Sequence, residues 1–203
     1  MKKHIPFFSV LGEAQTYLNI VYILIAFPLS LVYFSLIVTG FSLSVGLLVI
    51  FVGLFVFAGT MGLIRGFRWL DIQLSKVFLG VNIPMHHPER KTLGFFPFIK
   101  TLLGSSTTWK GFVYYLLVKL PIDTIIWSVS ISFLAITLDL LLAPLLIKFW
   151  WFADDDVSRW LIEFFDDVYI LPFLGIIWGM ITLHVIRGLA KLSGSLNEVF
   201  LGD

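Results

Sequence analysis

Four apolar segments, each long enough to cross a lipid bilayer, constrain this chain more than any other feature of its sequence. About 20 apolar residues cross the hydrocarbon core of a membrane as a helix. The segments cover residues 20–40, 43–64, 114–147 and 169–186. With 59% hydrophobic and 13% charged residues, the chain is also far more apolar than a soluble domain. The sequence therefore predicts an all-α, polytopic membrane helical bundle. The first partner that we expect is the lipid bilayer around it.

The spacing of the segments predicts how they are connected. Only Phe41 and Ser42 separate the first two segments, so we expect a tight antiparallel hairpin. The third segment is overlong, because its 34 residues would form a helix of about 50 Å. We expect it to bend, tilt or project outward, and we expect Pro144 to end it.

The second and fourth segments belong to an internal repeat. At a constant offset of 122, residues 53–80 align with residues 175–202 and agree at 11 of 28 positions. Unrelated sequences of this composition agree at roughly two or three such positions. Each copy is an apolar run, then Ile-Arg-Gly, then a stretch of mixed polarity. This order predicts a membrane helix that leaves the bilayer and turns along its surface.

A weaker repeat relates the first and third segments. At an offset of 93, residues 22–38 align with residues 115–131, and Tyr22 is paired with Tyr115. Both copies start on the same side of the membrane, so the repeat is parallel rather than inverted.

Together the two repeats predict the domain organisation. We expect a single membrane domain over 1–203, with four transmembrane helices arranged as two tandem helical hairpins. The repeat halves are about 17–82 and 110–203, related by a pseudo-twofold axis along the membrane normal.

The basic residues predict the orientation. Cytoplasmic loops of membrane proteins carry an excess of Lys and Arg. Eleven such residues precede the first segment, separate the second from the third or follow the fourth, whereas only Lys148 and Arg159 lie in the remaining loop. We therefore expect a cell-membrane protein with both termini in the cytoplasm. Arg65, Arg68 and Arg187 would then lie at the cytoplasmic interface.

Three further stretches place apolar residues on one helical face, which predicts short interfacial amphipathic helices. They cover residues 67–78, 157–168 and 189–200. The stretches that follow the second and fourth segments either anchor the ends of the bundle or carry a tilt of those spans to the cytoplasm. The stretch in the outer loop would lie across the external mouth of the bundle.

Four motifs resemble the multi-pass sensor domain found at the N-terminus of some membrane histidine kinases. They are WKGFVYYLLVKLP at 109–121, YILIAFP at 22–28, GLIRG at 62–66 and FLG at 78–80. The resemblance implies a domain that senses an envelope or membrane signal and passes it to a kinase, and it assigns no ligand or catalytic residue. None of the four histidines precedes kinase-like segments, so we expect a stand-alone subunit with a separate cytoplasmic kinase or transcription regulator as its partner.

Acidic residues are concentrated in the predicted outer loop. Asp154, Asp155 and Asp156 are consecutive, and carboxylate oxygens bind divalent cations or cationic peptides. Their spacing matches no calcium loop, and a solvated acidic face is the simpler interpretation. We keep the three residues as candidate ligand-binding groups and predict no metal site.

Asp123, Asp139 and His184 are ionisable residues within or next to the predicted spans. Such groups are costly in hydrocarbon and are often functional, so each is a candidate for a ligand or proton role. Local alternatives stay open. Asp123 is close enough in sequence to Lys119 for an interfacial ion pair, and Asp139 is equally consistent with the outer boundary of the third span.

Small residues recur at every fourth position in two segments. Ala58, Gly62 and Gly66 form one stripe, and Gly175 and Gly179 form another. Such stripes allow the backbones of two membrane helices to approach closely. Packing within the chain is the default interpretation, and a homodimer is the sharper one.

No residue pattern in the sequence predicts catalysis, so we expect no enzyme and no cofactor. The sequence has neither a phosphate loop nor a nucleophile elbow, and nothing in its charge distribution predicts a nucleic-acid partner. Two classes of function remain. The first is a membrane sensory or regulatory subunit. The second is a small transporter or lipid-handling protein with a path between the two hairpins.

The predicted orientation is testable by cysteine labelling, because the natural chain contains no cysteine. We expect Asp155→Cys to react with a membrane-impermeant maleimide in intact cells. Lys100→Cys should react only after the membrane is permeabilised, since it lies between the second and third segments. Labelling of both variants to the same extent in intact cells would contradict the orientation.

Overall fold

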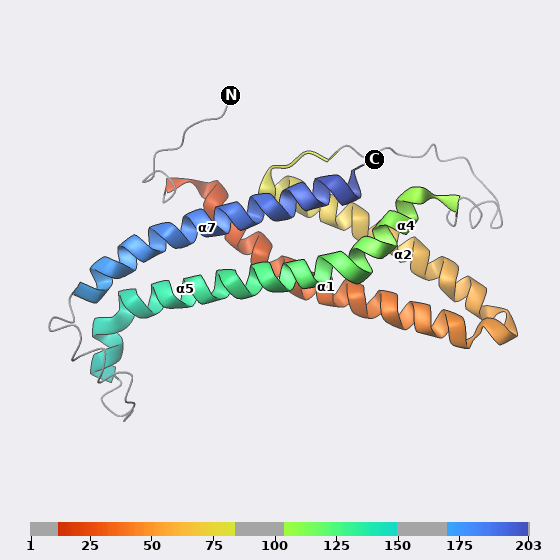
Figure 1. Cartoon of the computed structure of the whole chain (residues 1–203), viewed down its shortest axis with the longest axis horizontal. Helices are drawn as coiled ribbons and strands as arrows, with labels where there is room; N and C mark the ends of the chain where they lie inside the picture. Colours follow the sequence, from red (N-terminus) through yellow and green to blue (C-terminus); the bar gives the residue numbers. More distant parts are fainter. Residues whose placement is uncertain (1–11, 84–103, 150–169, 203) are drawn as a thin grey trace. The chain divides into compact units, whose positions relative to one another are not determined.

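The computed structural model describes residues 12–83, 104–149 and 170–202. These residues form helices and contain no strand, which confirms the all-α class (Figure 1). The long helices are α1 (Ala14–Gly46), α2 (Val52–Leu74), α4 (Ser106–Val113), α5 (Lys119–Phe149) and α7 (Ile170–Leu201). The short elements are the 3-10 turn η2 (Leu48–Ile50) and two π-helical segments, η3 (Ser75–Leu79) and η4 (Tyr114–Val118).

The chain divides into two compact units, which are described separately below. The larger unit combines Tyr17–Trp127 with Leu189–Asp203, and the smaller unit combines Met1–Thr16 with Ser128–Gly188. Helices α5 and α7 therefore contribute residues to both units.

Helices α1 and α2 form an antiparallel hairpin, but the predicted link at Phe41 and Ser42 is wrong. Helix α1 continues to Gly46, and the chain turns through η2 instead. The turn ends at Phe51, whose φ of 59° is left-handed, and Gly53 N–H donates to the carbonyl of Leu47 at 3.0 Å. Side chains on the hairpin tip are apolar and exposed, so no polar turn residue marks the turn in the sequence.

The predicted turn along the membrane surface is absent after both the second and the fourth segments. Helix α2 runs unbroken past Arg65 and leads directly into η3, and α7 runs unbroken past Arg187 to Leu201. The predicted stretches 67–78 and 189–200 are the end of α2 with η3 and the end of α7, and the stretch 157–168 lies outside the described residues. Some of their polar residues are buried, with Asp71 3% and Asn197 0% exposed, because these side chains find partners on other helices.

The third apolar segment is confirmed as overlong. Helical structure continues without interruption from α4 through η4 into α5. Pro144 lies inside α5 and does not end it, which corrects the expectation that the helix stops there. Helix α5 instead changes direction near its C-terminal end (Figure 1), as expected when a proline removes one backbone hydrogen bond.

Three helical stretches in the described part of the chain are long and apolar enough to cross a membrane. They are Ala14–Gly46, Thr108–Leu145 and Ile170–Leu201. Helix α2, the predicted second span, is not among them; it carries Arg65 and Arg68 within its 23 residues. The chain is therefore a helical membrane protein by length and composition.

Aromatic rings organise the core of the larger unit. The Tyr33 ring stacks on Phe67 with centroids 4.2 Å apart and meets Tyr115 edge-on at 5.3 Å. These contacts join α1, α2 and η4. Ile37 and Met61 are fully buried beside them. Such ring pairs add directional attraction to the burial of apolar area.

In the smaller unit, α5 and α7 approach closely at glycine. A Cβ atom added at Gly175 would lie 2.9 Å from Leu141 N, and one at Gly179 would lie 3.1 Å from Thr137 Cγ2. Nearby, the Phe133 and Trp178 rings stack at 5.4 Å. The small residue at 175 therefore permits a helix contact that any side chain would obstruct.

Substitutions at two glycines, Gly175 on α7 and Gly62 on α2, provide a test of this packing. We expect Gly175→Ala to lower the free energy of unfolding by about 1–3 kcal/mol, because the new methyl group meets α5 backbone atoms. Gly62→Ala is the control, since an added Cβ there meets nothing within 4 Å and alanine favours the helix. Chemical unfolding in detergent, followed by circular dichroism, measures both. Equal stability of the two variants would contradict the close approach.

Candidate functional site

A buried lysine with two carboxylates lies at the centre of the larger unit. Lys119 Nζ is 3.3 Å from Asp71 Oδ2 on α2 and 3.2 Å from Asp123 Oδ2, one turn further along α5. The side chains of Lys119, Asp71 and Asp123 are 1%, 3% and 4% exposed. We call these three residues the ionic triad. Charged groups this deeply buried are rare, because their desolvation is costly unless they are paired.

Tyrosines surround the ionic triad. The Tyr33 hydroxyl donates to Asp71 Oδ1 at 3.3 Å, and the Tyr115 hydroxyl faces the same carboxyl group. The Tyr114 ring lies 5.9 Å from Lys119 Nζ, within the range of a cation–π contact. These groups stabilise both the ammonium and the Asp71 carboxylate in a region that is shielded from solvent.

A hydrogen-bond network around Asn197 lies next to the ionic triad and is joined to it by Tyr114, whose ring contacts Lys119. Asn197 Nδ2 donates to Tyr22 OH and to Ser75 Oγ, both at 2.9 Å, and its Oδ1 accepts from Tyr114 OH at 2.7 Å. Tyr22 OH also lies 3.2 Å from Ser193 Oγ on α7. Asn197 is completely buried. Helices α1, α2, α5 and α7 thus all supply polar groups to one cluster.

Two π-helical segments place these side chains. Ser75 begins η3, and Tyr114 and Tyr115 begin η4. A π-helical turn contains an extra residue, which rotates the following side chains relative to a regular α-helix. In η4 this allows consecutive tyrosines to be buried together, 3% and 1% exposed, immediately before Lys119. π-helical turns occur frequently at functional sites.

The chemistry available to the cluster is electrostatic. It has carboxylates, phenols, an amide and an ammonium, all held by mutual contacts. No group of three or more metal-ligating side chains occurs in the described part of the chain. The cluster can bind or release a proton. It can also transmit a change in one helix to others, because Lys119 is paired with Asp71 on α2 and Asn197 is bonded to residues of α1, η3 and η4.

The structure separates the ionisable residues predicted as candidates. Asp123 belongs to the ionic triad, and its local pairing with Lys119 is observed. Asp139 is exposed on α5. His184 is half-buried on α7, and its Nδ1 lies 2.9 Å from the carbonyl oxygen of Met180. Ligand roles for Asp139 and His184 stay predictions, and Asp154, Asp155 and Asp156 lie outside the described residues.

The arginines predicted at the cytoplasmic interface include two with defined partners. Arg68 donates from Nε and an NH2 group to the carbonyl oxygen of Leu201, at 2.9 and 2.6 Å. Arg68 therefore caps the C-terminal end of α7 from α2, where the helix dipole favours a cation. In the smaller unit, Arg187 pairs with Glu13. Arg65 is half-buried on α2.

The candidate packing residues also differ from one another. Ala58 is 7% exposed, whereas Cβ atoms added at Gly62 and Gly66 would meet nothing within 4 Å. Gly62 and Gly66 are therefore not at close contacts within the described part of this chain. Their use in a homodimer stays a prediction.

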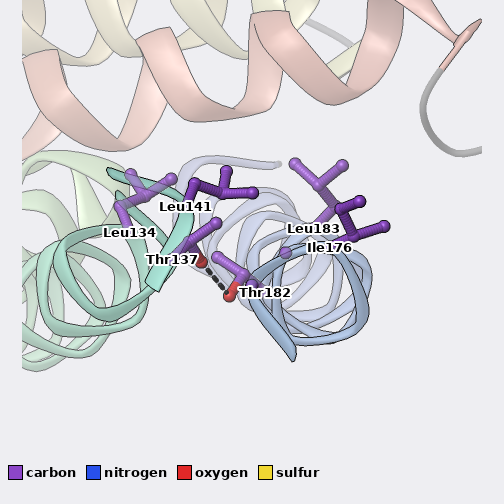
Figure 2. A pocket seen from close by; sticks show the side chains of 8 residues that line it. Leu134, Thr137, Leu141, Ile176, Thr182 and Leu183 are labelled. Carbon is purple, nitrogen blue, oxygen red and sulfur yellow. Dashed lines mark hydrogen bonds between the residues drawn. The ribbon is translucent and has the colours of Figure 1, made fainter. Parts of the chain in front are cut away.

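The smaller unit contains an apolar pocket between α5 and α7, with a volume of about 340 Å³ (Figure 2). Thr137 and Thr182 lie on its two sides and are hydrogen-bonded to each other at 2.9 Å. Each hydroxyl also contacts a carbonyl of its own helix. The remaining lining is aliphatic side chains and glycine, which suits a hydrocarbon chain rather than a polar ligand.

Sequence reasoning missed most of the cluster. The stretches that contain Asp71, Ser75 and Asn197 were predicted to be amphipathic surface helices, and no buried role was predicted for these residues or for the tyrosines. One signal was available: the offset of 122 pairs Ser75 with Asn197, and these two residues are hydrogen-bonded to each other. Contact between equivalent positions is expected near a symmetry axis.

Comparison with known families gives one result. A family model described as "Putative sensor" matches residues 22–201. The match includes every residue of the ionic triad and of the network around Asn197. Searches of curated proteins and of solved structures find no match to the chain.

Removing the central ammonium tests how far the cluster holds the larger unit together. We expect Lys119→Met to lower the free energy of unfolding by about 3–5 kcal/mol, because two buried carboxylates lose their cation. Lys110→Met, at an exposed position nearby, should change it by less than about 0.5 kcal/mol. Chemical unfolding in detergent measures both variants. A Lys119→Met protein as stable as the control would show that the ion pairs contribute little.

Proposed function

Because the chain belongs to the sensor family whose model matches residues 22–201, we propose that it is a membrane sensory subunit. It would respond to an envelope or membrane signal and pass that signal to a separate cytoplasmic kinase or transcription regulator. The family supports a role without catalysis, and we assign the chain no chemical reaction of its own.

The observation that carries this proposal is the connection between the buried cluster and the end of α7. Asn197 is bonded to residues of α1, η3 and η4, and Arg68 of α2 caps α7 four residues later. A displacement of α1 or α2 in the membrane would therefore move the C-terminal turns of α7. Coupling requires such a contiguous set of contacts between the input and output elements.

We also propose that the chain forms two tandem hairpins with four spans, as the repeats predict. Matching local features support this. Thr60 and Thr182 are equivalent at the offset of 122, both are buried, and each donates to the carbonyl four residues earlier at 2.9 Å. Ile64 and Ile186, also equivalent, are 1% and 0% exposed.

The proposed output surface is the end of α7 together with η3. Val199 and Val77 are 73% and 62% exposed there. Exposed apolar side chains suit a protein partner. With both termini in the cytoplasm, as the basic residues predict, this surface faces the partner. A homodimer through the Gly62 and Gly66 stripe is compatible with it, because those glycines have open space around them.

A lipid-handling role is the second candidate function, and one observation favours it. The apolar pocket between α5 and α7 has the lining expected for an acyl chain (Figure 2). In that role the pocket would hold a membrane lipid during transfer.

The sensory role is tested in a strain that lacks the gene. We expect the transcriptional response to envelope stress to require the chain, and Asn197→Leu to abolish that response because α7 loses its bonds to the cluster. Glu198→Gln, at the exposed neighbouring position, is the control and should restore the response. RNA sequencing measures the response, and immunoblotting checks equal amounts in the membrane. An unchanged response in the deletion strain would contradict the proposal.

A photo-crosslinking residue identifies the partner in the same cells. Val199 and Phe173 are both 73% exposed and lie near opposite ends of α7. The residue at 199, but not at 173, should capture a cytoplasmic kinase or regulator. Deletion of the captured protein should then abolish the same response.

A further inference from the structure

The ionic triad has more negative than positive charge. With every group ionised, Asp71 and Asp123 contribute two negative charges and Lys119 one positive charge, and all three side chains are at most 4% exposed. A net charge buried in a membrane protein is costly. Loss of the Lys119 proton would make the imbalance worse, whereas one proton on either carboxyl group would remove it.

Among the described residues, no second cation is paired with a carboxylate of the triad. From α1 the neighbouring ionisable groups are Tyr22 and Tyr33, and from η4 they are Tyr114 and Tyr115. Helix α7 and η3 contribute neutral groups, Ser193, Asn197 and Ser75. Arg68 is directed to the carbonyl of Leu201.

The internal repeat supplies a neutral counterpart of the triad. The offset of 122 pairs Asp71 with Ser193, and the offset of 93 pairs Lys119 with Ala26 and Asp123 with Ser30. The counterparts Ser193, Ala26 and Ser30 are also buried. Tyr22 lies beside Ser193 as its equivalent Tyr115 faces Asp71. The same scaffold position is therefore compatible with uncharged residues, so the charges are not required simply to fill it.

The geometry points to a buried proton-binding site, in which Asp71 and Asp123 share one proton beside Lys119. This inference rests on the proposed sensory function and deepens it, because it makes protonation of the cluster the event that α7 transmits. With the proton bound, the triad is neutral. When the proton leaves, a carboxylate competes for Lys119 and for the hydroxyls of Tyr33 and Tyr115. Tyr114 connects this change to α7, because its ring contacts Lys119 and its hydroxyl donates to Asn197.

Infrared spectroscopy of the purified protein tests the site directly, in a detergent without ester groups. We expect the carbonyl stretching band of a protonated carboxylic acid at neutral pH, where exposed carboxyl groups are ionised. The band should be lost in Asp71→Asn and in Asp123→Asn, because the remaining carboxylate then balances Lys119. Asp139→Asn removes an exposed carboxyl group of the same helix and should leave the band unchanged.

The pH dependence of folding stability provides a second readout, and the proposal predicts its direction. A folded state that binds one more proton than the unfolded state loses stability as pH rises, by about tenfold in the folding equilibrium constant per pH unit. This loss begins near the ordinary aspartate pKa, about 3.9, and ends where the folded protein releases the proton. We expect the unfolding temperature to fall over that interval in the natural protein and to be flatter in Asp123→Asn.

A neutral variant guards against misfolding of the single variants. Asp71→Ser with Lys119→Ala and Asp123→Ser reproduces the buried residues at the equivalent repeat positions, Ser193, Ala26 and Ser30, so it should fold, lack the band and lose the pH-dependent part of its stability. Absence of the band in the natural protein, or its persistence in both Asn variants, would overturn the proposal. So would a dependence of stability on sodium at fixed pH, because a bound cation would then replace the proton.

These measurements separate the proton site from the sensory role. They use purified protein and need no partner. A normal infrared band with no stress response in cells would sink the sensory function and leave the site intact. A stress response with no band would do the reverse.

Discussion

Burial of the Lys119 ammonium between two aspartates is the interaction on which the packing of the larger unit depends. An ammonium that is 1% exposed must replace its lost hydration with fixed partners, and the protein supplies them from α2 and from the next turn of α5. Those partners need further donors, which brings the α1 and η4 tyrosines inward. The neighbouring hydroxyls of Tyr22 and Tyr114 are satisfied by Asn197, which joins this core to α7.

This requirement also explains why α2 and α7 continue without a turn and direct polar residues toward other helices. Their amphipathic pattern is real, but Asp71, Ser75 and Asn197 face other helices rather than water. A helical pattern of apolar and polar residues reports only that two faces differ. It does not report whether the polar face meets solvent or a buried polar network. In this chain the buried network is favoured because α1, α2, α5 and α7 place hydrogen-bonding and charged groups within reach of one another.

The length and apolarity of the segments predicted the helix class and three of the long apolar helices, since hydrophobic length is read directly from the sequence. The position of the first turn was missed because the chain around Phe51 is apolar and has no polar turn residue. Pro144 was misread because a proline kinks a long membrane helix more readily than it ends one. The pairing of Lys119 with Asp71 and the partners of Asn197 were missed because these residues lie far apart in the sequence, up to 175 residues for Asn197 and Tyr22.

The unequal charges on equivalent positions suggest how a repeated scaffold acquires a response. The ionic triad is formed by both halves of the sequence repeat, with Asp71 from the first and Lys119 and Asp123 from the second. Its counterparts at the repeat offsets, Ser193 from the second half and Ala26 and Ser30 from the first, are uncharged. A change of charge therefore acts at only one of two positions that the repeat makes equivalent. Ser75 and Asn197 are equivalent to each other at the offset of 122, and their hydrogen bond joins the two halves. The charge on one position and the shared contact together provide what a two-state membrane sensor requires: a local input, and a contact between the halves that responds when they shift.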